Sequence, residues 1–326
     1  MSGLRAGLIG CGAIGGVHSE AVAGLDGIRM AAFCDVVEQK ARDLCTRYGG
    51  DYATNDAGRV LADHSLDTVY ICTHHDTHAD YCIRAAEAGK NVLVEKPLAL
   101  TVEDCRKIGD AVEREGIQLF TAFKMRYYPM VQKARELIPD PLMVVMQMMD
   151  NRWGDTWAND PVLGGGNVYS QGCHSCDLLR YMAGSDPEEV YAAGGNYYQP
   201  NGRLDNLTAT FRFENGAAGC WIQGDANQPA MTSKLFMEIF SENRSALLTD
   251  RFCTLTYTET GKEPAVYRGE EGGFVEENRL FVEALRTGAP MAADHVDGLM
   301  ATLMMIQAGR SIESGNPERV ASLARA

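Results

Sequence analysis

The first 123 residues alternate short apolar runs with longer amphipathic stretches. The amphipathic stretches predict helices near residues 13–24, 37–48, 77–88 and 102–115. Buried strands separated by helices of this length predict a parallel, doubly wound sheet, here in an N-terminal domain of residues 1–124. The predicted strands are Ala6–Ile9, Met30–Cys34, Thr68–Cys72, Asn91–Val94 and Gln118–Phe123.

The pattern changes after Pro129. A helix near 130–138 is followed, from residue 189 to residue 257, by successive strand-like runs without helices between them. Glu214-Asn215-Gly216 is a hairpin signal that joins two of these runs. Strands in this order predict a large, open, mainly antiparallel sheet in a second α/β domain of residues 125–326, with closing helices near 275–287 and 295–314.

Composition narrows the classes of partner. The 326 residues carry a net charge of −14, which disfavours binding to nucleic acid or to anionic membranes. No apolar stretch is long enough to span a membrane, and "MSGLRAGLIGCG" does not resemble a signal peptide. The ten cysteines are scattered singly, mostly through apolar stretches, as reduced thiols are. We therefore expect a cytoplasmic protein without nucleic-acid or membrane partners.

A glycine-rich motif lies between the first predicted strand and the first helix. In it Gly10 permits a tight turn, Gly12 lets a pyrophosphate approach the backbone, and Gly15 lets helix and strand pack closely. Asp35 ends the second strand, where an acid binds ribose hydroxyls, so we predict NAD as cofactor. NADP stays possible because Arg42 is near enough to accommodate a 2′-phosphate. The loop residues predicted to bind the cofactor are Gly10, Cys11, Gly12, Ala13, Ile14 and Gly15.

Three histidines follow the predicted strand Thr68–Cys72. Thr73, His74 and His75 come directly after it, and His78 starts the next helix. Ligands bind at the carboxyl ends of parallel strands, so these four residues are predicted to line the cofactor. A metal site is the alternative, but the spacing matches no zinc pattern and no metal is predicted.

Further motifs extend over nearly the whole chain. They are "GxGxxGxxH", "AGKNVLVEKPLALT", "FKMRYYP" and "WANDPVLGGG" followed by "GCHSCDLLRYMAG". In these motifs the chain resembles the Gfo/Idh/MocA family, named for glucose–fructose oxidoreductase and inositol dehydrogenase. The resemblance implies a Rossmann domain, an α/β domain with an open antiparallel sheet, and oxidation or reduction of sugars or polyols with NAD(P).

The resemblance also implies the catalytic residues. Lys96 stabilises the developing alkoxide, Glu95 and a cis Pro97 hold that lysine, and His174 acts as the base. Glu95 and Lys96 are thereby included among the cofactor-binding residues. Ser170 stands where the family has an aspartate, so His174 lacks its usual carboxylate. A metal site formed by Cys173, His174 and Cys176 is disfavoured, because both cysteines occupy variable positions.

The segment "DNRWGDTWANDP" is the predicted substrate-facing loop. Trp153 and Trp157 suit stacking on a sugar ring, although packing under the loop or against another subunit is an equal alternative. The predicted substrate-binding residues are Lys96, Arg126, Asn151, Arg152, Trp153, Trp157, Ser170 and His174.

Three functions are consistent with these residues. The first is an NAD-dependent dehydrogenase that acts on a secondary hydroxyl of a sugar, glycoside or cyclitol. The second is an enzyme that retains NAD and oxidises its glycoside transiently, to drive elimination, hydrolysis or epimerisation. Ser170 motivates this second function. The third is a non-catalytic NAD(P)-binding regulator, which the presence of both Lys96 and His174 disfavours. The open sheet is also the predicted surface for a homodimer or homotetramer.

Overall fold

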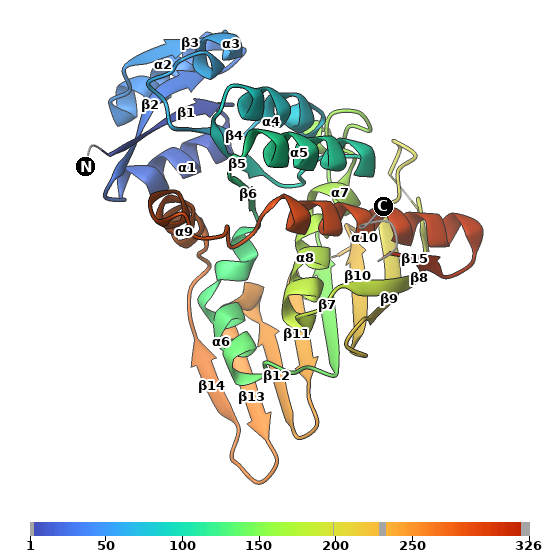
Figure 1. Cartoon of the computed structure of the whole chain (residues 1–326). Helices are drawn as coiled ribbons and strands as arrows, with labels where there is room; N and C mark the ends of the chain where they lie inside the picture. Colours follow the sequence, from blue (N-terminus) through green and yellow to red (C-terminus); the bar gives the residue numbers. More distant parts are fainter. Residues whose placement is uncertain (1–2, 198, 228–232, 321–326) are drawn as a thin grey trace. The chain divides into compact units, whose positions relative to one another are not determined.

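The computed structural model describes residues 3–197, 199–227 and 233–320. It divides the chain into two compact units, each described here by itself (Figure 1). Unit 1 takes Met1–Lys124 and Phe274–Gly298, and unit 2 takes Met125–Gly273 and Leu299–Ala326. Residues 274–298, which the sequence pattern assigns to the domain 125–326, therefore fold with unit 1.

Among its described residues, unit 1 is built on a six-stranded parallel sheet with the strand order β3-β2-β1-β4-β5-β6. Because the order reverses between β1 and β4, helices lie on both faces, and α1 contacts α2 and α9 whereas α4 contacts α5. The strands are β1 Leu4–Ile9, β2 Ile28–Cys34, β3 Tyr52–Thr54, β4 Thr68–Ile71, β5 Asn91–Glu95 and β6 Leu119–Ala122. The helices are α1 Ala13–Ala23, α2 Glu38–Tyr48, α3 Ala57–Leu61, α4 His78–Glu87, α5 Val102–Glu115 and α9 Phe274–Thr287, with the 3-10 turn η1 at His75–Thr77.

The predicted doubly wound sheet is confirmed, and local sequence accounts for its elements. β4 and β6 are fully buried, as expected of strands covered on both faces. The α5 helix begins after Thr101, whose Oγ1 accepts the Asp104 N–H at 3.0 Å. It ends at Gly116, whose left-handed φ of 65° suits glycine.

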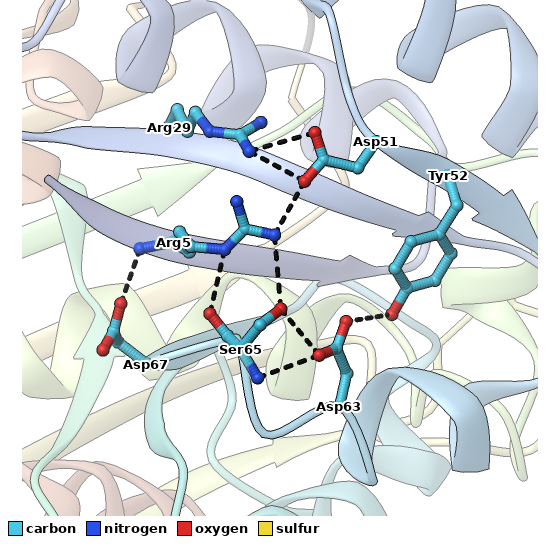
Figure 2. Close-up of polar contacts among 7 residues, drawn as sticks. All are labelled: Arg5, Arg29, Asp51, Tyr52, Asp63, Ser65 and Asp67. Atoms are coloured by element: carbon cyan, nitrogen blue, oxygen red, sulfur yellow. Dashed lines mark hydrogen bonds and ion pairs between the residues drawn. The ribbon is translucent and has the colours of Figure 1, made fainter. Parts of the chain in front are cut away.

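Charged side chains hold the amino ends of the strands together (Figure 2). Arg5 of β1 contacts Asp51 Oδ2 at 2.7 Å and the Ser65 carbonyl at 2.9 Å, and Arg29 of β2 shares Asp51. Asp63 in turn accepts the Tyr52 hydroxyl at 3.0 Å. Ligands bind such sheets at the opposite, carboxyl end, so this network has a structural role.

Unit 2 contains, in its described residues, a nine-stranded sheet of order β14-β13-β12-β11-β7-β10-β9-β8-β15. Its neighbouring strands are antiparallel except for the parallel pair β7 and β10. The strands are β7 Met143–Met149, β8 Pro187–Gly195, β9 Asn206–Phe213, β10 Ala218–Gly224, β11 Leu235–Phe240, β12 Arg244–Thr249, β13 Thr254–Glu259, β14 Ala265–Arg268 and β15 Glu318–Arg319. The helices and turns are η2 Lys124–Tyr127, α6 Pro129–Leu137, η3 Trp157–Asn159, α7 Asn167–Ser170, α8 Gly172–Ala183, η4 Asp250–Phe252 and α10 His295–Ser314, of which Lys124 and His295–Gly298 fall in unit 1.

Helices cover one face of this sheet. The α8 helix contacts β7 and β10, and α6 contacts β12 and β13. Alternate residues of β7 and β11 are buried on that face, which is the period expected of a sheet with one covered side. The predicted open, mainly antiparallel sheet is therefore confirmed. None of the helices in the described part of the chain has the length and apolar character that crossing a membrane requires.

Candidate functional site

The glycine loop of unit 1 joins β1 to α1 at the switch point of the sheet. Gly10 has a φ of +99°, and a Cβ there would lie 2.3 Å from the Cys72 carbonyl oxygen. A Cβ at Gly15 would lie 2.1 Å from the Gly10 carbonyl oxygen, so both positions require glycine for packing. At Gly12 a Cβ would meet nothing within 4 Å. Gly12, Ala13 and Ile14 are exposed, so the start of α1 offers its amides to an anionic ligand.

Asp35 anchors this loop to the end of β2. Its carboxylate accepts the Cys11 N–H at 2.9 Å and the Val37 N–H at 2.8 Å. Each oxygen keeps a further lone pair, which can accept a ribose hydroxyl. Arg42 contacts Glu38 at 2.8 Å. The arrangement around Asp35 therefore fits an NAD ribose.

Cys11 is a buried member of the glycine loop. Its N–H is committed to Asp35, its thiol contacts the Cys34 carbonyl at 3.4 Å, and its side chain is buried. Burial, with the nearby charge of Asp35, raises the pKa of the Cys11 thiol to about 12.

The segment after β4 separates into exposed and buried residues. His74 is exposed and Thr73 is half-buried, so both remain candidates for contacting a cofactor. His75 is buried, with its ring 5.7 Å from that of His78. His78 is fully buried, with Nδ1 2.8 Å from the Pro97 carbonyl and Nε2 3.3 Å from the Thr73 carbonyl. His78 therefore ties the end of β4 to the loop after β5, and its predicted contact with the cofactor stays a prediction.

Glu95, Lys96 and Pro97 follow β5 at the carboxyl end of the sheet. The Lys96–Pro97 peptide bond is cis, as the resemblance implies. Glu95 Oε2 accepts the backbone N–H of Lys96 at 3.2 Å, and the Lys96 side chain is half-buried. Burial alone would raise the pKa of Glu95. The hydrogen bond from His18 and the positive charges of Lys96 and Lys124 act in the opposite direction, and the pKa of Glu95 lies below its ordinary value.

His18, the histidine of the "GxGxxGxxH" motif, was not predicted to belong to the site. It is fully buried on α1, with Nε2 3.1 Å from Glu95 Oε1 and Nδ1 3.0 Å from the Asn278 amide nitrogen. The position of His18 at the end of that motif was the sequence signal that could have identified it as a site residue. Asn278 is 260 positions away from His18, and no local pattern connects the two.

In unit 2, His174 lies in the first turn of α8 and is 3% exposed. A Cβ on Gly172 would lie 2.7 Å from the Trp221 ring, so this glycine lets the start of α8 approach β10. Ser175 Oγ donates to Gln223 Oε1 at 3.0 Å, and the Gln223 amide donates to Asn167 Oδ1 at 2.7 Å. These contacts fix the helix that carries His174.

Ser170 and the two cysteines beside His174 lie inside unit 2. Ser170 ends α7 and is buried. Cys173 and Cys176 are fully buried, and burial holds the pKa of Cys176 well above its ordinary value. Within residues 3–197, 199–227 and 233–320, no group of three or more His, Cys, Asp or Glu side chains could hold a metal ion.

Arg126 lies in η2 and is buried. Its guanidinium forms a bidentate, buried ion pair with Asp177 of α8, with Nε 2.8 Å from Oδ2, and it lies 5.1 Å from the Tyr181 ring. A guanidinium satisfied in this way ties η2 to α8. The contact with a substrate predicted for Arg126 stays a prediction.

The predicted substrate loop, residues 150–161, presents some of its side chains and anchors others. Trp157 is 40% exposed, and Asn151 and Arg152 are exposed. Trp153 is half-buried, and its Nε1 donates to Asp150 at 3.1 Å. Of the two tryptophans, Trp157 is the better placed for stacking on a ligand.

Comparison with known proteins identifies the family. Residues 4–123 match the model of the oxidoreductase family with NAD-binding Rossmann fold, and residues 131–245 match the GFO/IDH/MocA C-terminal domain. A myo-inositol 2-dehydrogenase of Thermotoga maritima is 27% identical, over 95% of this chain and 96% of the relative. A levoglucosan dehydrogenase of Pseudarthrobacter phenanthrenivorans is 28% identical, over 73% of this chain and 72% of the relative.

The fold comparison agrees. The structure of a levoglucosan dehydrogenase in complex with NADH superposes with a TM-score of 0.90 at 22% identity, over 98% of this chain and 99% of the other. Two models of one family thus match consecutive parts of the chain. The chain belongs to the Gfo/Idh/MocA family of oxidoreductases, and its residues 4–123 form an NAD-binding Rossmann domain.

Proposed function

We propose that the protein oxidises a secondary hydroxyl of a sugar, glycoside or cyclitol, with NAD as the hydride acceptor. The observation that carries this proposal is the position of Lys96. It follows β5 at the carboxyl end of the same sheet whose β1–α1 loop has an open Gly12. The names of the inositol and levoglucosan dehydrogenase relatives support cyclitols and anhydrosugars as substrate classes.

The cofactor is proposed to bind at the start of α1. The amides there receive the pyrophosphate against Gly12, and Asp35 accepts the adenosine ribose hydroxyls. Thr73, His74 and Lys96 are the further candidates for contact. A 2′-phosphate would meet the Asp35 carboxylate, and Arg42, the cation suited to neutralise it, is paired with Glu38. This supports NAD over NADP.

Lys96 and His174 are proposed to handle the charge and the proton of the substrate hydroxyl. Bound NAD supplies the acceptor for the hydride. The ammonium of Lys96 stabilises the oxygen as negative charge develops on it, and the His174 imidazole takes the proton. Trp157, Asn151 and Arg152 are proposed to contact the rest of the substrate.

Replacement of Lys96 tests the proposal. Wild type should form NADH with at least one member of a panel that includes myo-inositol and levoglucosan. Lys96→Met should reduce kcat by about a hundredfold or more and change NAD affinity only a few-fold, because a charge-stabilising group is lost. Lys107→Met, at an exposed position on α5, is the matched control and should keep wild-type turnover. Near-normal turnover in Lys96→Met would refute the assignment.

Ser170 favours a second candidate function, in which NAD stays bound and the substrate is oxidised only transiently. A serine cannot stabilise a protonated His174 as a carboxylate does. A reaction that depends on this stabilisation in relatives with aspartate at position 170 would therefore proceed differently in this protein. Product formed from a glycoside without net NADH would select this function. A steady rise in NADH absorbance would select the dehydrogenase.

We also propose that the protein is cytoplasmic and forms a dimer or tetramer through the uncovered face of the unit 2 sheet. Several half-buried apolar side chains lie on that face and alternate with residues that the helices cover. They are Val145, Ile222, Phe236 and Leu247.

A further inference from the structure

A buried chain of hydrogen bonds in unit 1 leads from α9 to the loop that carries Lys96. The Asn278 amide donates to the Phe274 carbonyl at 2.7 Å and lies 3.0 Å from His18 Nδ1. His18 Nε2 lies 3.1 Å from Glu95 Oε1, and Glu95 Oε2 accepts the Lys96 N–H at 3.2 Å. Both His18 and Asn278 are fully buried.

The carbonyl of Phe274 determines which atoms donate and which accept along this chain of hydrogen bonds. A carbonyl oxygen only accepts, so the Asn278 atom that faces it is the amide nitrogen. The second hydrogen of that nitrogen then points to His18 Nδ1, which must be the unprotonated ring nitrogen. The proton of the neutral imidazole therefore lies on Nε2 and is donated to Glu95. Asn278 thus sets the tautomer that Glu95 requires.

The side chains around His18 hold its ring in place. Phe274 of α9 meets the His18 ring edge-on at 5.5 Å, and Tyr70 of β4 lies 5.7 Å from it. The ring therefore keeps one orientation, and its hydrogen bonds decide which nitrogen faces Glu95.

A second carboxyl group, that of Glu277, interacts with Glu95. Its carboxyl group is fully buried, and within the described residues neither oxygen has a hydrogen-bond partner. Burial, reinforced by the charge of Glu95 and opposed by that of Lys124, holds the pKa of Glu277 well above its ordinary value. Burial therefore favours the neutral form of Glu277, and Glu95 is the carboxylate that faces the His18 N–H.

We propose that Asn278 is a positioning residue for Lys96, acting through the tautomer of His18 and the carboxylate of Glu95. The inference rests on the role proposed for Lys96 in the reaction. It gives α9, a helix distant in sequence from the glycine loop, a part in fixing the backbone of Lys96 through the Glu95 carboxylate.

The first test reads the tautomer of His18 in the wild-type protein. Long-range nitrogen–proton NMR of the full chain distinguishes the two imidazole tautomers, and His18→Gln assigns the His18 signals among those of the seven histidines. At neutral pH we expect the Nε2–H tautomer. An Nδ1–H tautomer, or a doubly protonated ring, would overturn the proposal.

The second test follows the backbone of Lys96. Asn278→Leu keeps the number and branching of the side-chain heavy atoms and removes both donors. It should speed hydrogen exchange at the Lys96 amide about fivefold, since one supporting hydrogen bond is lost. Val275→Ala, on the same helix at a position 61% exposed, is the control and should leave that exchange unchanged. Equal exchange in Asn278→Leu and wild type would overturn the proposal.

Turnover separates this inference from the proposed function. In a wild type that forms NADH from a panel sugar, Asn278→Leu should lower kcat about tenfold and leave KM within a few-fold, the signature of a misplaced catalytic group. Unchanged kcat would contradict the positioning role while the proposed function stands. Should wild type turn over no sugar, the proposed function fails, and the tautomer and exchange results still decide the role of Asn278.

Discussion

Two glycines of the same motif illustrate how one residue type serves packing at one position and access at another. A Cβ at Gly15 would lie 2.1 Å from a backbone oxygen, whereas a Cβ at Gly12 would enter open space. Backbone cannot yield as a flexible side chain does, so only the Gly15 clash must be relieved by moving the loop against α1. The same substitution at the two positions should therefore fail in different ways.

We expect Gly15→Ala to lower the free energy of unfolding by about 1–3 kcal/mol or more through overpacking. Gly12→Ala should keep the stability of wild type and weaken NAD binding at least about tenfold, because the methyl group occupies the space proposed for the pyrophosphate. Urea unfolding and fluorescence titration with NADH measure the two effects. Unimpaired NADH binding by Gly12→Ala would remove the proposed pyrophosphate position.

Glu277 should make the stability of the protein fall as pH rises. The pKa of Glu277 is raised in the folded protein by burial and by Glu95, with Lys124 acting in the opposite direction. Its contribution is fully present below the unfolded pKa of about 4.3 and is lost as pH rises through the folded pKa. Glu277→Gln cannot ionise, so its stability relative to wild type should increase from pH 5 to pH 8, by up to about 1.4 kcal/mol per pH unit.

Urea unfolding at the two pH values measures this difference. Glu276→Gln, at a neighbouring exposed position on α9, should show no comparable trend. A Glu277→Gln variant that tracks wild type at both pH values would mean that Glu277 is ionised in the folded protein.

At the scale of elements, periodicity located the longer strands and helices and missed those that depend on partners. The predicted helix near 102–115 coincides with α5. In contrast, β3 has three residues and α3 has five, too few to display a period. The two-residue β15 exists through pairing with β8. The parallel pairing of β7 with β10 joins strands that are not consecutive, and the order of strands along the chain does not encode it.

The candidate site was predictable to the same extent. Residues with a motif around them, such as Asp35 and Lys96, lie at the strand ends where they were expected. The burial and the partners that tertiary contacts determine were not predictable, as with His78 between two carbonyls and Arg126 on Asp177. Asn278 carries no local signal, because its partner comes from the other end of the chain.

A buried lysine joins two loops of unit 1 and should matter for stability alone. Lys90, which precedes β5, donates to the carbonyls of Asp63 at 2.8 Å and Leu66 at 2.7 Å. Burial lowers the pKa of this lysine, which is 4% exposed. Lys90→Met leaves both carbonyls without that donor and should cost about 2 kcal/mol of unfolding free energy. The exposed Lys107→Met should cost little by the same urea measurement, and an equal loss in both variants would contradict the role given to Lys90.

At the scale of the whole molecule, the uncovered face of the unit 2 sheet predicts self-association. On β7, Val145 and Gln147 point away from the face that α8 contacts, and the adjacent β11 places Phe236 opposite Gln147. A sheet face that mixes half-buried apolar residues with a few polar ones is suited to a symmetric interface, because the same patch serves both copies. A second copy of the chain carries the same net charge of −14. Apolar contact, rather than attraction between opposite charges, must therefore hold the two copies together.

We therefore expect light scattering after gel filtration to give two or four times the chain mass of 35.6 kDa. Phe236→Lys places a charge where apolar surface would be buried, and desolvating that unpaired charge costs more than the lost contact, so this variant should elute as a single chain. Val275→Lys introduces the same charge at an exposed site on α9 of unit 1 and should keep the wild-type mass. A wild type of single-chain mass at micromolar concentration would rule out the interface. Dissociation by both variants would show that added charge in general, and not the sheet face, controls assembly.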